Sequence, residues 1–217
     1  MKTQNRWNIQ ATHEQMQSNA AVKEIASALH LRLPTAYLLY NRGCQTPAEA
    51  KAFLEKETEQ MHDPFDMADM EEAVPRLLEA VENKENIVIY GDYDVDGVTS
   101  VSSLYLYLKS LDANVTYYIP SRTGEGYGMS ECAIRKLAEA GTNLIVTVDT
   151  GVTAVREAKL ITELGMELIV TDHHECLSEL PKAVAVVDPH RPDCPYPFKE
   201  LAGVGVVFKL ICAYEMY

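Results

Sequence analysis

Residues 87–97 read IVIYGDYDVDG, a short apolar run that ends in a glycine and three alternating aspartates. Segments with helical spacing of apolar residues flank this run, at Met70–Asn83 before it and at Val98–Leu111 after it. A strand-like run between helices of about a dozen residues is typical of a βαβ unit, in which strands pair in parallel. The stretch therefore predicts a strand of a parallel sheet whose end carries a cluster of negative charge.

The same alternation continues to the end of the chain. Further strands are expected at Val115–Ile119, Leu144–Val148, Glu167–Val170 and Ala183–Val187, and further helices at Ser130–Ala140, Thr153–Leu164 and Phe198–Tyr214. The run NLIVTV at residues 143–148 has the continuous apolar character of a strand that is covered on both faces. We expect an α/β fold: a doubly wound, mostly parallel sheet flanked by helices.

The residues before this alternation have a helical pattern. Helices are expected at Glu14–Leu31 and Pro34–Asn41. A third begins at residues 46–49, TPAE, which place a hydroxyl N-cap before a first-turn proline and a glutamate. We expect a helical N-terminal region over residues 1–68 and an α/β domain over residues 69–217.

The composition is that of a globular protein, with 47% hydrophobic and 24% charged residues in a chain of 217. No apolar run approaches the roughly 20 residues that span a bilayer, and the polar segment Met1–Gln10 lacks the apolar centre of a signal peptide. We therefore expect a cytoplasmic protein without a membrane partner. The five cysteines are scattered and form no CxxC pair, which argues against a disulfide framework or a structural zinc cluster.

The formal net charge is −13. This value argues against a protein whose whole surface is basic and binds nucleic acid by charge alone. It does not exclude a nucleic-acid enzyme, because bound metal ions neutralise catalytic carboxylates.

Aspartates and histidines follow several of the predicted strands. Besides the aspartates of residues 92–96, they are Asp149, Asp172, His173, His174, Asp188 and His190. Ligands of parallel α/β sheets bind outside the carboxyl ends of the strands. We therefore expect these side chains to meet at one rim of the sheet.

Plainer interpretations of the first cluster explain less. A capped turn between strand and helix would use one carboxylate, Asp96, and would leave the others to repel each other. An EF-hand needs a glutamate at the twelfth loop position, where Ser103 stands, and a helix where this chain has a strand. The glycines at positions 124, 126 and 128 do not fit the GxGxxG pattern of a dinucleotide-binding turn.

Carboxylates together with imidazoles indicate a divalent-metal site. The donor set suits Mn²⁺ or Mg²⁺, and Mn²⁺ accepts a nitrogen ligand better. Structural zinc fits poorly because the set contains no thiolate. The ligands outnumber what one ion with open positions needs, so we expect two ions about 3.5–4 Å apart that share a carboxylate.

The combination of DYDVDG at residues 92–97, Asp149 and DHH at residues 172–174 resembles the DHH phosphoesterase superfamily, whose fold is a doubly wound α/β domain. Residues 121–128, 188–194 and 201–207 resemble the branch of this superfamily that digests single-stranded DNA. Tyr90 supports this branch, because many relatives that act on small substrates have a histidine at that position, four residues before Asp94.

The resemblance implies roles for individual residues. The metal ligands would be Asp94, Asp96, Asp149 and His173, with Asp149 bridging the two ions. His174 would face the substrate phosphate, which makes Asp149 and His174 the catalytic residues.

Three other residues would support the ligands or contact the substrate: Asp92, Asp172 and Arg122. Arg122 would position a phosphate, with an ordinary loop arginine as the alternative. For Asp188 and His190, a simple turn before Pro192 is as good an explanation as a place in the site.

The implied activity is metal-dependent hydrolysis of phosphodiesters, with 5′-to-3′ exonuclease action on single-stranded DNA in repair and recombination. A single-strand-binding protein or a helicase would be a partner. Two alternatives stay open: a phosphodiesterase of the same superfamily for short oligonucleotides or cyclic dinucleotides, and a non-catalytic nucleic-acid-binding relative.

The superfamily carries a further metal-binding aspartate beyond the helix expected near Phe198, as well as further domains. We therefore expect residues 69–217 to be a DHH-type catalytic domain that is truncated at its C-terminal end. Such a domain could hold only one metal ion well, or lack activity alone.

Overall fold

The computed structural model describes residues 12–55, 61–121 and 128–217. The chain divides into two compact units, Met1–Met61 and His62–Tyr217. This division lies seven residues before the expected boundary after residue 68. The short 3-10 helix η2 (Pro64–Asp66) and Met67 account for the difference, because Met67 is 2% exposed and belongs to the core of the α/β unit.

The N-terminal unit contains the helices α1 (His13–Ser18), α2 (Ala20–Ala28), α3 (Leu33–Asn41) and α4 (Pro47–Leu54). The prediction of a single helix from Glu14 to Leu31 is wrong, because two helices, α1 and α2, occupy this segment. The segment breaks at Asn19, whose backbone is extended and whose side chain caps α2 by accepting a hydrogen bond from Val22 N at 3.1 Å. The capping box that begins α4 at Thr46 is present as expected.

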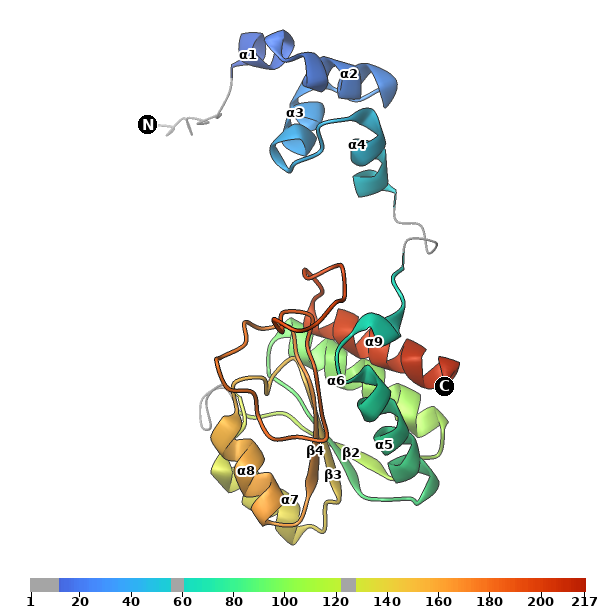
Figure 1. Ribbon diagram of the computed structural model, residues 1–217, viewed down its shortest axis with the longest axis vertical. Helices are drawn as coiled ribbons and strands as arrows, with labels where there is room; N and C mark the ends of the chain where they lie inside the picture. Colours follow the sequence, from blue (N-terminus) through green and yellow to red (C-terminus); the bar gives the residue numbers. More distant parts are fainter. Residues whose placement is uncertain (1–11, 56–60, 122–127) are drawn as a thin grey trace, which may run out of the picture. The chain divides into compact units, whose positions relative to one another are not determined.

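The α/β unit is built on a sheet of five parallel strands in the order β2-β1-β3-β4-β5 (Figure 1). The strands are β1 (Ile87–Tyr90), β2 (Val115–Tyr118), β3 (Leu144–Val148), β4 (Glu167–Thr171) and β5 (Ala185–Val187). Every strand pair in this sheet is parallel. The predicted fold class is confirmed.

Helices cover both faces of this sheet (Figure 1). One face carries α5 (Met70–Glu82), α6 (Val95–Ser110) and α9 (Gly203–Met216), and the other carries α7 (Glu131–Glu139) and α8 (Val155–Glu163). Successive residues of a strand point to opposite faces, so Val146 joins the first core and Ile145 the second. Among the described residues, no helix has both the length and the apolar character needed to cross a membrane.

Two helices next to the sheet rim begin elsewhere than expected. Helix α6 begins at Val95 and not at Val98, because Asp94 is its N-cap and accepts a hydrogen bond from Gly97 N at 3.0 Å. The capping role considered for Asp96 is therefore wrong. Helix α9 begins at Gly203, five residues after the expected start at Phe198.

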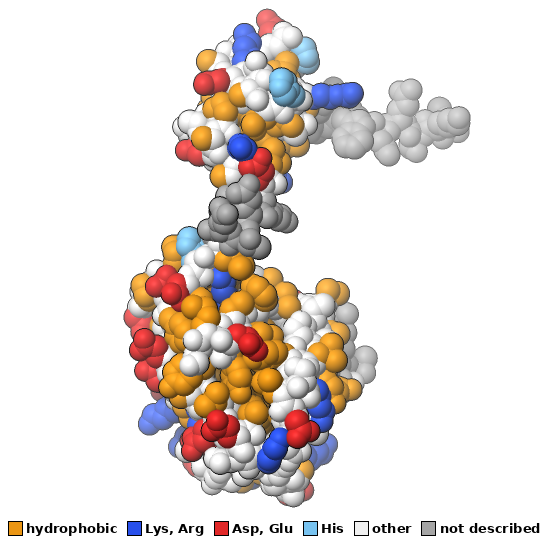
Figure 2. All heavy atoms as spheres, turned by 90° about the vertical axis from the view of Figure 1, so that its right-hand side faces the viewer, with side chains coloured by type: hydrophobic (Ala, Val, Ile, Leu, Met, Phe, Trp, Pro, Cys, Tyr) orange, Lys and Arg blue, Asp and Glu red, His pale blue; other side chains and the backbone are white. Residues whose placement is uncertain are grey.

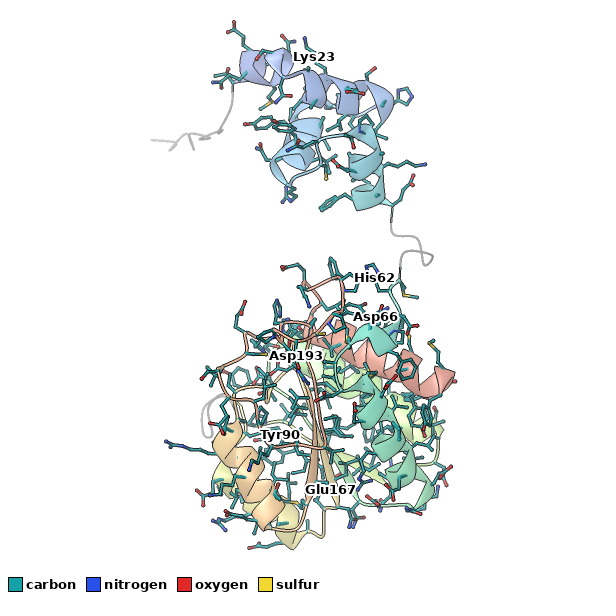
Figure 3. The ribbon with its side chains drawn as sticks, in the orientation of Figure 1. Lys23, His62, Asp66, Tyr90, Glu167 and Asp193 are labelled. Carbon is teal, nitrogen blue, oxygen red and sulfur yellow. The ribbon has the colours of Figure 1, made fainter. Side chains whose placement is uncertain are left out.

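The strands are aligned so that their carboxyl ends meet at one edge. Tyr90 of β1 pairs with Thr147 of β3, and Val148 of β3 pairs with Thr171 of β4. Figure 3 shows Glu167, the first residue of β4, and Asp193 at opposite ends of the α/β unit. The segments that follow the strands are thus brought together at the edge opposite Glu167.

Arg191 fixes the segment that follows β5. Its Nη1 lies 2.6 Å from Asp69 Oδ2 and donates to the carbonyl of Val186 at 2.6 Å, while Nε and Nη2 bond both oxygens of Asp193 at 3.0 and 2.7 Å. Asp69 also accepts a hydrogen bond from Val186 N at 3.0 Å. The Arg191 side chain is 8% exposed, so one buried cation joins β5, its loop and Asp69, the N-cap residue of α5.

We expect Arg191→Lys to lower the free energy of unfolding of the α/β unit by about 1.5–3 kcal/mol, because an ammonium cannot reproduce the fork of bonds to two carboxylates. Urea unfolding followed by the near-ultraviolet circular dichroism of the tyrosines measures the change. Arg135→Lys is the control, since its exposed pair with Glu131 contributes less than about 0.5 kcal/mol. Equal effects of the two substitutions would contradict this role of Arg191.

Candidate metal centre

The loop after β1 and the end of β3 bring three carboxylates together. Asp92, Asp94 and Asp149 each offer an oxygen that lies within 4.8 Å of the others. Asp92 and Asp149 are 1% and 2% exposed. Asp92 Oδ1 is buried and has no hydrogen-bond partner in the part of the chain that the structure describes.

Asp149 also belongs to a second group, formed with His173 and His174, whose ligand atoms again lie within 4.8 Å of one another. His173 Nε2 is 3.1 Å from Asp149 Oδ1. Asp149 has a φ of 58°, a left-handed conformation that few residues other than glycine adopt and that is often found at functional sites. Asp149 is the residue that the two groups share.

Asp172 holds the loop that carries both histidines. Its Oδ1 accepts hydrogen bonds from the backbone N–H of His173 at 2.7 Å and from the ring Nδ1 of His174 at 2.7 Å, and its Oδ2 accepts one from Val152 N at 2.9 Å. Burial opposes ionisation of this carboxyl, but the bonds from His174 and the backbone lower its pKa. Asp172 therefore supports the histidines and is not in either of the two groups of candidate ligands.

The hydrogen bond that the His174 ring donates to Asp172 also affects the ionisation of His174. It raises the pKa of His174 to about 9, against the opposing effect of burial. The raised pKa favours the positively charged form of the ring. A cationic imidazole at the rim suits the stabilisation of a phosphate, the role that the resemblance implies for His174.

Negative charge is concentrated around Asp149. Burial, followed by the charges of Asp96 and Asp94, raises the pKa of Asp149 to about 7. Carboxylates that crowd in this way favour either a proton or a cation between them. Oxygen donors together with imidazole nitrogens fit Mn²⁺ and Mg²⁺, so the residues present suit the expected metals.

Asp96 occupies a different position from the other candidate ligands. Its Oδ2 accepts a hydrogen bond from Gly203 N at 2.7 Å, and its Oδ1 accepts one from Val204 N at 2.8 Å. Its Oδ2 is also 3.6 Å from His173 Nε2. The structure thus brings Asp96 to the edge of the cluster and bonds it to the first turn of α9.

The segment after β5 adds a further buried carboxylate. Asp188 is fully buried, its Oδ1 accepts a hydrogen bond from His190 N at 2.7 Å, and burial raises its pKa to about 6. The sequence left two explanations for Asp188 and His190, a turn before Pro192 and a place in the site. The structure shows the turn. Arg122 lies outside the described residues.

The backbone groups of α9 were missed at the level of sequence. Residues 201–207 carry the resemblance, but their pattern assigns no chemistry to Gly203. A signal was present in the form of a glycine-containing helix start without a Ser, Thr, Asp or Asn to cap it. Such a helix needs acceptors from elsewhere in the chain.

The family model described as "DHH family, N-terminal domain" matches residues 86–217. The chain belongs to the DHH family. Among the relatives of this DHH chain is the single-stranded-DNA-specific exonuclease RecJ of Bacillus subtilis, which is 49% identical over 205 residues, covering 94% of this chain and 25% of the relative. The chain thus spans about a quarter of the length of that relative.

Two crystal structures of RecJ resemble this DHH chain. The Mn²⁺ complex of RecJ from Thermus thermophilus is 29% identical with a TM-score of 0.69, over 91% of this chain and 27% of the other. A manganese-bound exonuclease RecJ is 35% identical with a TM-score of 0.64, over 69% of this chain and 38% of the other. The expected resemblance to the DHH superfamily and its RecJ branch is confirmed.

Asp149 makes the stability of the metal-free DHH chain depend on pH. Its folded-state pKa of about 7 exceeds the ordinary value of 3.8, so the stability that its proton brings is present at low pH and is lost as the pH rises through 7. Asp149→Asn keeps the shape of the side chain, cannot ionise and tolerates the left-handed backbone. We expect the thermal unfolding midpoint of this variant, measured relative to that of the wild type in the presence of a chelator, to increase as the pH rises from about 5 to about 8. A difference between the two midpoints that stays constant with pH would contradict this.

Proposed function

We propose that the protein is a metal-dependent 5′-to-3′ exonuclease that hydrolyses single-stranded DNA. The observation that carries the proposal is the meeting of Asp92, Asp94, Asp149 and His173 at one rim, with a buried carboxylate oxygen that no described residue compensates. The 49% sequence identity to an exonuclease specific for single-stranded DNA supports single-stranded DNA as the proposed substrate. The two manganese-bound RecJ structures support a divalent metal as the proposed cofactor.

Each residue has a proposed task. Asp94, Asp96, Asp149 and His173 would hold two Mn²⁺ or Mg²⁺ ions, with Asp149 as the ligand common to both. Asp92 belongs to the same group of oxygens as Asp94 and Asp149. Asp96 can serve although it accepts two backbone bonds, because each carboxylate oxygen has two acceptor sites.

Divalent ions bound there would make a water molecule acidic enough to act as nucleophile at neutral pH and would neutralise charge on the phosphate. His174, held by Asp172 and positively charged, stabilises the negative charge that develops on the phosphate oxygens. Asp172 keeps the ring in place and compensates its charge. Arg122 is proposed to position a phosphate.

The chain does not attract the DNA backbone through an overall positive charge. Figure 2 shows Lys and Arg side chains scattered among acidic and hydrophobic ones on the face that it draws, and the net charge is −13. Electrostatic binding of single strands uses a basic groove, and the face drawn in Figure 2 does not show one. A single-strand-binding protein or helicase partner, a role in repair and recombination, and a cytoplasmic location belong to the same proposal.

The test is digestion of a labelled single-stranded oligonucleotide, the matching duplex and a dinucleotide, by this chain and by a form extended to the length of its relatives. We expect the extended form to release 5′-mononucleotides from the 5′ end of the single strand, with Mn²⁺ and not with chelator. Digestion of the dinucleotide alone would favour the small-substrate alternative. A lack of metal-dependent hydrolysis by both forms would favour the non-catalytic alternative.

We expect Asp149→Asn to reduce this hydrolysis by more than about 100-fold. The loss of a residue that only supports a metal ligand reduces activity by about 10- to 100-fold, so a larger loss indicates a ligand. The substitution removes the shared carboxylate and keeps the left-handed backbone. Asp112→Asn is the matched control, because Asp112 has a φ of 57° and is exposed beside Lys84. Near-normal turnover by Asp149→Asn would remove the bridging role.

A further inference from the structure

Helix α9 lacks a cap of its own. It runs from Gly203 to Met216, and its N-cap residue, Ala202, has no side chain that could accept a hydrogen bond. The first N–H groups of a helix have no partner within the helix and need acceptors from outside. Asp96 supplies them from α6, with Oδ2 at 2.7 Å from Gly203 N and Oδ1 at 2.8 Å from Val204 N.

A second, independent observation concerns the other side of Gly203. A Cβ atom on this residue would lie 2.5 Å from Asp149 Oδ1, 2.7 Å from its Cβ and 2.8 Å from its Cγ. These distances are too short for any side chain, so Asp149 occupies the space that a larger residue would need. Gly203 is therefore next to two carboxylates of the candidate metal centre. Its N–H donates a hydrogen bond to Asp96, and Asp149 occupies the space where a Cβ atom would lie.

We propose that the first turn of α9 is a clamp that sets the positions of Asp96 and Asp149, and that Gly203 is its positioning residue. The partial positive charge at the start of a helix stabilises the carboxylate of Asp96 and fixes its orientation. The absence of a Cβ lets Asp149 stand close enough to be shared. The effect of the clamp on metal binding rests on the proposed function, whereas the contact of Gly203 with Asp149 does not.

Gly205 offers a matched control in the same helix. A Cβ there would meet Leu201 Cδ2 at 3.2 Å and Leu201 Cβ at 3.5 Å, and the first of these atoms is the end of a flexible side chain. Both glycines lie in the first turn of α9, and both substitutions add a single methyl group. The clash with Asp149 is made by Gly203→Ala and not by Gly205→Ala.

The first measurement is calorimetric titration of this chain with Mn²⁺. We expect Gly203→Ala to raise the dissociation constant by more than about tenfold, a change of about 1.4 kcal/mol, and Gly205→Ala to leave it within about twofold. Arg191→Lys is a control for general destabilisation, because it weakens the fold at a different place. We expect this variant to bind Mn²⁺ normally. Wild-type affinity in Gly203→Ala, or an equal loss in all three variants, would overturn the positioning role.

The second measurement needs no metal. In chelator, we expect Gly203→Ala to lower the thermal midpoint, and Asp149→Gly, which empties the space, to restore it in the double variant. A double variant as unstable as the sum of the two single changes would overturn the contact. A wild-type chain that binds no Mn²⁺ would overturn the metal centre and the effect of the clamp on it, while the double variant would still decide whether Gly203 and Asp149 are coupled.

Discussion

Mutual repulsion among buried carboxylates is the constraint on which this site depends. Parallel strands in register end at one edge, and the chain places Asp92, Asp149, Asp172 and Asp188 there, each at most 2% exposed. Removing a charge from water costs on the order of several kcal/mol unless partners compensate it. A rim of this composition is stable only because hydrogen-bond donors, protons or cations balance each carboxylate.

The backbone provides part of this balance and divides the carboxylates into two kinds. Asp172 and Asp96 accept N–H groups from loops and from a helix start. For Asp172, the hydrogen bond from the His174 ring and these backbone bonds together outweigh burial and lower the pKa. Asp149 has the opposite balance, since burial and its acidic neighbours raise its pKa. Asp92 Oδ1 has no partner among the described residues. Buried carboxylate oxygens of Asp149 and Asp188 likewise have no hydrogen-bond partner among the described residues. Of these three residues, Asp92 and Asp149 lie in one group of candidate ligands, which is where a divalent ion would bind.

Much of this arrangement could be predicted from sequence because it follows from local patterns. Alternating apolar runs and helical segments are enough to indicate a parallel sheet. In a parallel sheet the strand ends meet at one edge, which is enough to place Asp149 and His173 at the same rim of the sheet as Asp94. The choice of α6 cap between Asp94 and Asp96 was not predictable, because aspartates two residues apart have the same intrinsic tendency to cap. The bonds from α9 to Asp96 join residues 107 positions apart, and no local pattern encodes them.

These long-range contacts also tie the site to the folding of the whole unit. The candidate centre draws on residues from 92 to 204, so a cation that binds it favours the state in which all five strands and both α6 and α9 are in place. Binding to the folded state alone raises stability in proportion to the logarithm of ligand concentration. The crowding of carboxylates that costs stability in the metal-free protein is what makes this coupling strong. A clamp made of backbone N–H groups serves such a site well, because it holds a carboxylate without adding a cationic side chain that would compete with the metal.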